Sequence, residues 1–149
     1  MGSRVQNSAS TTTGATSFMD LYSMVTGLIG QKGRRGALMI NIDVNHPDIE
    51  HFIDIKNSDS EKVRFANISI NITDDFMRQV VTDGDYELNF KVEATGEVIS
   101  KVVKARELFR KIAENNWNSA EPGMLFKDKI DNWHLMSHDP TFEYAGVNP

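Results

Sequence analysis

The strongest constraint on the fold is the alternation of helical and strand-like apolar patterns along the chain. Helices are predicted over 18–31, 46–55, 74–81, 105–117 and 128–135, and strands over 37–44, 64–72, 86–92 and 97–103, with a further short apolar run at 123–126. Strands that alternate with helices predict an α/β fold. The pair 86–92 and 97–103, joined by Ala94-Thr95-Gly96, predicts a β-hairpin inserted into it.

Several local signals mark where the predicted helices begin. Ser17 and Asp20 read as a capping box for the first helix, His46 as a cap for the second and Thr73 as a cap for the third. The first helix carries an apolar stripe at helical spacing: Phe18, Leu21, Tyr22, Val25, Leu28 and Ile29. The helix over 105–117 is expected to gather Leu108, Phe109, Ile112, Ala113 and Trp117 on one face.

Two tryptophans, Trp117 and Trp133, are interpreted as core or interface anchors rather than as stacking platforms.

Composition excludes several classes of function. The chain has 149 residues, enough for one domain, and 16 basic against 21 acidic residues give a net charge of −5, which argues against a general nucleic-acid binder. It contains no cysteine, so these residues supply neither a thiol nucleophile nor a cysteine-ligated metal. Because there is no long apolar run and no apolar core near the N-terminus, we expect a cytoplasmic protein without a membrane segment.

Three segments could bind a ligand. The Gly30–Gly36 segment, with Arg34 and Arg35, could hold an anion, or it could be a glycine-terminated helix followed by a solvated basic turn. The polar stretch 56–62 reads as a loop, suited to mobile ligand contact or to an exposed connector. His134 and His138 have metal-ligand spacing only on a continuous helix, which Asp139-Pro140 interrupts, so we predict no metal site.

Several stretches together, in order and spacing, resemble a known family. They are Thr13-Gly-Ala-Thr-Ser-Phe-Met-Asp20, Gln31-Lys-Gly-Arg-Arg-Gly-Ala-Leu-Met39, His46-Pro-Asp-Ile-Glu-His-Phe-Ile53, Phe65-Ala-Asn-Ile-Ser-Ile70, Asp74-Asp-Phe-Met77, Ser119-Ala-Glu-Pro-Gly123, Ser137-His-Asp-Pro140 and Tyr144-Ala-Gly-Val-Asn-Pro149. This set resembles the catalytic subunit of ribonucleotide reductase, in particular the adenosylcobalamin-dependent class II enzymes. The resemblance covers nearly the whole chain, 1–149.

The resemblance implies part of a ten-stranded α/β barrel with a β-hairpin insertion. It implies reduction of ribonucleotides to deoxyribonucleotides for DNA synthesis, by a cysteine thiyl radical that adenosylcobalamin generates. The family's finger loop reads Asn-Pro-Cys-Gly-Glu; Asn148-Pro149 match its first two positions, so Asn148 corresponds to the asparagine that contacts the substrate ribose.

The resemblance also implies a binding site for a nucleotide effector, a deoxynucleotide or ATP, at a dimer interface. The stretch 1–13, with Arg4, resembles the first specificity loop, and 57–67 resembles the second. In that second segment Asn57, Ser58, Lys62, Arg64 and Asn67 are the candidate substrate or effector contacts. The helix over 18–31 would then belong to the interface of a homodimer.

We expect the chain to be a truncated part of the reductase that is inactive by itself and needs the remaining segments as partners. An end at Pro149, directly before the expected cysteine, fits the upstream flank of an intein, because splicing needs a Cys, Ser or Thr next. A reading-frame break or an excised piece would look the same. The alternatives are a stand-alone nucleotide-binding or regulatory module, and a structural part that folds only beside its flanks.

Overall fold

The computed structural model describes residues 12–29, 36–58, 62–93, 95–136 and 138–142. The helices are α1 (Ala15–Leu28), α2 (Ile49–Ser58), α3 (Asp74–Thr82), α4 (Ala105–Ser119) and α5 (Lys127–Trp133). The strands are β1 (Met39–Asp43), β2 (Asn67–Ile72), β3 (Asp85–Lys91), β4 (Val98–Lys104) and β5 (Gly123–Phe126). The short apolar run at 123–126 is therefore a strand.

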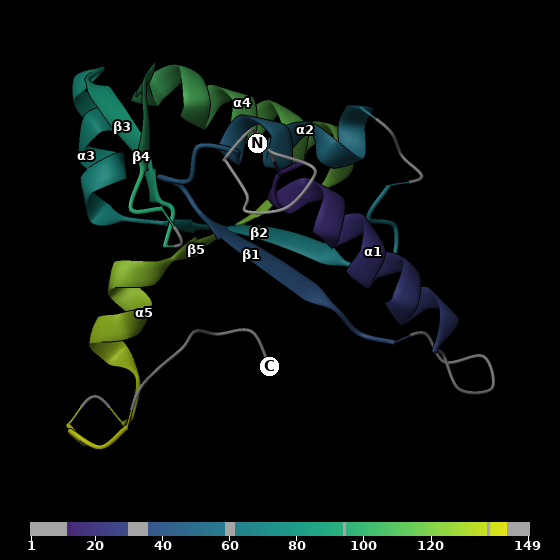
Figure 1. The fold of residues 1–149 in the computed structure, drawn as a ribbon. Helices are drawn as coiled ribbons and strands as arrows, with labels where there is room; N and C mark the ends of the chain where they lie inside the picture. Colours follow the sequence, from purple (N-terminus) through teal and green to yellow (C-terminus); the bar gives the residue numbers. More distant parts are fainter. Residues whose placement is uncertain (1–11, 30–35, 59–61, 94, 137, 143–149) are drawn as a thin grey trace.

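The central element is a parallel sheet with strand order β1-β2-β5 (Figure 1). Met39 is aligned with Asn67 in the first pair, and Ser69 with Gly123 in the second. The predicted α/β class is confirmed. Among the described residues these three strands form an open sheet, so the barrel that the family implies is not closed here.

The core lies between this sheet and the helices α2 and α4, which Figure 1 shows together on one side of it. Ile68, Ile70 and Ile72 alternate along β2 and are at most 1% exposed, and Phe52 of α2 and Ile112 of α4 are equally buried. The intervening Ser69 and Asn71 point to the opposite face, since side chains alternate along a strand. That face is polar: Asn71 Nδ2 donates to Asp43 Oδ1 at 2.8 Å.

The predicted hairpin is confirmed as the antiparallel pair β3–β4, inserted between α3 and α4. It is attached to the rest of the fold at the turn before α2, because Asn89 N–H donates to Asn45 O at 2.7 Å and the Phe90 ring lies 5.2 Å from the His46 ring. Leu88, which is fully buried, adds apolar contact to the core.

One prediction about α1 is wrong. The helix begins at Ala15 after Gly14, whose φ of 91° favours glycine, so Ser17 lies within the first turn and makes no capping box. Asp20 instead accepts a hydrogen bond from Val63 N–H at 3.3 Å. The apolar stripe of this helix lies outside the core of the described residues: every member is at least 42% exposed, while the buried positions are Thr16, Met19 and Ser23.

Two further predictions need correction. The helix α2 starts at Ile49 and continues to Ser58, so Lys56, Asn57 and Ser58 are helical rather than part of a loop. Its polar last turn is stabilised by long-range contacts that sequence periodicity does not report. In α4 the buried residues are Ala105, Leu108, Ile112 and Asn115, whereas Ala113 is exposed and Trp117 is 89% exposed.

Trp133 is 86% exposed, so neither tryptophan is a core residue in the described part of the chain. The predicted Thr73 cap of α3 is confirmed, since Thr73 Oγ1 accepts from Phe76 N–H at 3.1 Å. Within the described ranges, every helix is too short or too polar to cross a lipid bilayer.

Candidate functional site

At the amino-terminal end of the parallel sheet, the chain enters β1 and β2 side by side. Asn67 N–H, at the start of β2, donates to Leu38 O, directly before β1, at 2.9 Å. The chain therefore enters both strands at adjacent points of one edge. The Gly30–Gly36 segment leads into β1 and the 57–67 segment leads into β2, although residues 30–35 lie outside the described residues.

The second of these segments ends in a turn at residues 62–66, which we call the 62–66 turn. Its second residue, Val63, is fully buried and adopts a left-handed backbone with φ 54°. This conformation is rare for a β-branched residue and costs about 1–3 kcal/mol, so surrounding contacts must hold it. With Val63 buried as an anchor, the neighbouring Lys62 and Arg64 are exposed.

Two contacts with α1 hold this turn. Val63 N–H donates to Asp20 Oδ1, and Phe65 N–H donates to Ser23 Oγ at 2.9 Å. The Phe65 ring occupies the space above Gly27, where an added Cβ would come within 2.5 Å of the ring. The Arg64 guanidinium carbon lies 5.9 Å from the centre of the same ring. The two cations are therefore presented from a backbone that is bonded to α1.

The other candidate contacts in this segment differ in their surroundings. Asn57 is exposed, and its Nδ2 donates to Asn115 Oδ1 of α4. Ser58 is the last residue of α2 and its side chain lies outside the described parts. Asn67 is the first residue of β2 and is exposed. Lys62, Arg64 and Asn67 are therefore exposed within one short stretch, and Asn57 is exposed as well but bonded to α4.

Arg4 and Asn148, the candidates from the first loop and the finger loop, lie outside the described residues, so the structure gives no geometry for either.

The contacts that hold the 62–66 turn were missed by sequence reasoning. Asp20 and Ser23 of α1, and Lys56, whose Nζ donates to Ala66 O, are separated from the turn in sequence or were assigned other roles. No local pattern identifies such partners, since each contact depends on how distant elements pack.

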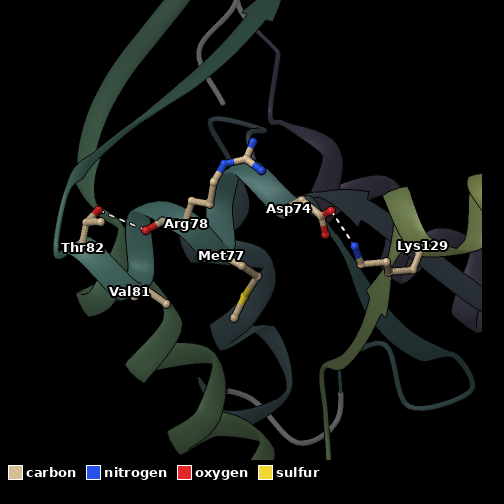
Figure 2. A pocket seen from close by; sticks show the side chains of 6 residues that line it. All are labelled: Asp74, Met77, Arg78, Val81, Thr82 and Lys129. Carbon is tan, nitrogen blue, oxygen red and sulfur yellow. Dashed lines mark hydrogen bonds and ion pairs between the residues drawn. The ribbon is translucent and has the colours of Figure 1, made fainter.

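The larger of two described cavities lies between α3 and α5, with a volume of about 460 Å³. Figure 2 shows Met77 and Val81 projecting from α3 and the ion pair between Asp74 Oδ2 and Lys129 Nζ at 2.8 Å. Arg78 is paired with Asp75 at 3.4 Å. The cavity is thus mainly apolar with balanced charges at its rim, and none of the predicted site residues lines it.

A smaller cavity of about 240 Å³ lies where α1, β1 and α2 meet, and His46 is one of its lining residues. His46 Nδ1 accepts a hydrogen bond from Asp48 N–H at 3.0 Å. The side chain that was expected to cap the second helix therefore bonds the backbone just before α2, which begins at Ile49. Burial lowers the pKa of His46 below its ordinary 6.5, and the carboxylates of Asp48 and Asp43 partly oppose this effect. The ring is therefore neutral at pH 7.

His134 and His138 form no metal-ligating cluster with other residues in the described part of the chain.

Comparison with known proteins places this geometry in a family. Residues 1–143 match the family described as "Ribonucleotide reductase, barrel domain". The vitamin B12-dependent ribonucleotide reductase of Streptomyces avermitilis is 36% identical over 152 aligned residues, covering 86% of this chain and 16% of that protein. The vitamin B12-dependent ribonucleoside-diphosphate reductase of Thermoplasma acidophilum is 39% identical over 119 residues, covering 79% and 15%.

A third relative, the vitamin B12-dependent ribonucleoside-diphosphate reductase of Mycobacterium tuberculosis, is 34% identical over 131 residues, covering 87% of this chain and 18% of that protein. The chain thus spans about one sixth of the length of these relatives. The match extends over both the parallel sheet and the inserted hairpin. The expected resemblance is confirmed, and the chain belongs to the ribonucleotide reductase barrel-domain family.

Proposed function

We propose that this chain supplies part of the barrel of a ribonucleotide reductase and one phosphate-contacting surface for a nucleotide. The phosphate-contacting surface is proposed from the pair of exposed cations, Lys62 and Arg64, which lie on either side of the buried Val63. Guanidinium and ammonium groups are the side chains that bind phosphate most strongly. The reaction of the whole enzyme is the reduction of a ribonucleotide to a deoxyribonucleotide.

The position of this turn supports the proposal. It lies at the end of the sheet where residues 36–38, which follow two arginines in the sequence, also lead into a strand. Asn67 stands exposed at the start of β2 and can accept or donate a hydrogen bond to a ribose or a base. Asn57 is the weakest of the candidates, because its amide is bonded to Asn115. Ser58 and Arg4 remain proposed contacts of the same nucleotide.

A nucleotide effector, a deoxynucleotide or ATP, is the proposed ligand of this surface, and the ribonucleotide substrate is the proposed ligand of Asn148. A homodimer through α1 is proposed because the exposed apolar residues of that helix have no cover among the described residues. The remaining segments of the reductase are the proposed partners of the open sheet.

Adenosylcobalamin is proposed as the cofactor of the whole enzyme, on the basis of the names of the relatives. The described residues do not fit it. A corrinoid with its nucleotide tail is far larger than the cavities of about 460 and 240 Å³, and the one histidine that lines either of them, His46, already uses Nδ1 internally.

Titration of the 149-residue chain with a deoxynucleoside triphosphate tests the binding surface. Arg64→Ala and Lys62→Ala are each expected to weaken binding by about tenfold, the loss of one charge-assisted contact. Lys91→Ala is the matched control, because Lys91 is an exposed lysine on the hairpin. The proposal is wrong if the unaltered chain shows no binding, or if the three variants bind equally well.

The same preparation tests the chemistry. We expect no deoxynucleotide product from the chain with adenosylcobalamin and a dithiol, because the chain has no cysteine to carry a radical. Product formation above the level without protein would contradict this.

A further inference from the structure

Lys56, in the last turn of α2, joins two segments that are far apart in sequence. Its Nζ forms an ion pair with Glu121 and donates a hydrogen bond to Ala66 O. Glu121 belongs to the turn at 119–122, which connects α4 to β5 and which we call the 119–122 turn. The two charged side chains are only 17% and 19% exposed. A pair so shielded from water is screened less than the other ion pairs of the described residues.

A second contact beside it reinforces the connection. Asn57 Nδ2 donates to Asn115 Oδ1, and Asn115, which is 9% exposed, also donates to Lys111 O at 2.9 Å. The end of α2 is therefore attached at two consecutive residues, with Lys56 bonded to the 119–122 turn and Asn57 to the last turns of α4. Within the 119–122 turn, Ser119 Oγ donates to Glu121 O at 3.0 Å, so the backbone that carries Glu121 is itself constrained.

The opposite side of the 62–66 turn is bonded to α1 through Val63 N–H and Phe65 N–H. Lys56 thus completes a two-sided attachment: α1 holds one side of the turn, and Lys56 holds its last carbonyl, at Ala66, to the segment that leads into β5. A left-handed Val63 needs such support to persist. The same contacts hold the backbone that carries Lys62 and Arg64.

From these contacts we infer that Lys56 is a positioning residue, which couples the 62–66 turn to the 119–122 turn so that the two segments open and close together. Through this coupling Lys56 would also position Lys62 and Arg64 to contact a nucleotide, and this part of the inference rests on the proposed function. The coupling itself rests only on the observed contacts.

Amide hydrogen exchange of the full chain tests the coupling. Lys56→Met keeps the length and apolar stem of the side chain but leaves Glu121 without its cation. We expect exchange to become about tenfold faster both in the 62–66 turn and at 119–126, with the β3–β4 hairpin unchanged. Lys129→Met is the matched control, because it breaks an ion pair that is more exposed, and it should alter neither segment.

The reversed pair, Lys56→Glu with Glu121→Lys, tests the ion pair directly and should restore most of the lost protection. The inference is overturned if Lys56→Met leaves exchange unchanged, if it accelerates only one of the two segments, or if it accelerates all amides equally, which would mean global destabilisation.

Nucleotide titration separates this inference from the proposed function. Lys56→Met should weaken the binding of a deoxynucleoside triphosphate about tenfold, while Lys56→Arg should retain it. Because Lys56 is paired with Glu121, this loss would reflect the position of the 62–66 turn rather than a direct contact with the nucleotide. If the unaltered chain does not bind nucleotide, the proposed function fails while the exchange experiment still decides the coupling. If it binds and Lys56→Met binds equally well, the positioning role is refuted.

Discussion

At the scale of single residues, His46 joins three parts of the fold. Its Nδ1 accepts from Asp48 N–H, its ring lies against Phe90 of the hairpin, and Asp48 Oδ2 in turn accepts from Ala15 N–H at the start of α1. A proton on Nδ1 would remove the first of these hydrogen bonds. Since burial holds the pKa of His46 below 6.5, the neutral ring is the form that the fold uses.

The pKa of His46 predicts how stability depends on pH. Because the folded chain binds fewer protons at this site than the unfolded chain, its contribution is complete above 6.5 and is lost as the pH falls from 6.5 through the lower folded value. His46→Asn should keep an acceptor for the Asp48 N–H without titrating. Urea midpoints at about pH 7.5 and about pH 5.5 should therefore fall less in the variant than in the unaltered chain. An equal fall in both would show that another group is responsible.

At the scale of elements, the carboxyl end of α4 offers a simple test of how the helix ends. Ala120 caps α4 in the left-handed region, with φ 60°, where glycine has no steric cost. Ala120→Gly should raise the free energy of unfolding by about 1 kcal/mol. Ala113→Gly, an exposed position inside the same helix, should lower it by a similar amount. Chemical denaturation of both variants decides this, and a loss of stability in Ala120→Gly would contradict the assigned end of the helix.

The elements also show what could be predicted from the sequence. Strand alternation in 67–72, the Thr73 cap and the hairpin were predictable because their signals are local. The end of α2 was not, because Lys56 and Asn57 are stabilised by Glu121 and Asn115, which are distant in sequence. For the candidate site, periodicity identified a polar segment before β2, but it could not show that Val63 is buried and left-handed or that Asn57 is bonded to Asn115.

At the scale of the whole molecule, α1 presents an apolar surface that is exposed among the described residues. The chain spans about one sixth of the length of its relatives, and we expect further segments or a second subunit to cover this surface and the open sheet. Leu21 and Leu28, which are 53% and 77% exposed, lie on such a surface. Exposed apolar patches promote association in water. Leu21→Lys with Leu28→Lys should therefore reduce concentration-dependent association, measured by sedimentation velocity, while the thermal midpoint stays unchanged.

Leu108→Lys is the matched control for this prediction, because Leu108 is only 4% exposed and a lysine there would bury an unpaired charge. That variant should unfold or lose several degrees of thermal midpoint. If the α1 variant lost as much stability as Leu108→Lys, the outer face of α1 would be part of the core of this chain and not a surface for further segments or a second subunit. If association were unchanged at full stability, the association surface would lie elsewhere, with exposed Trp133 and Leu135 as the next residues to alter.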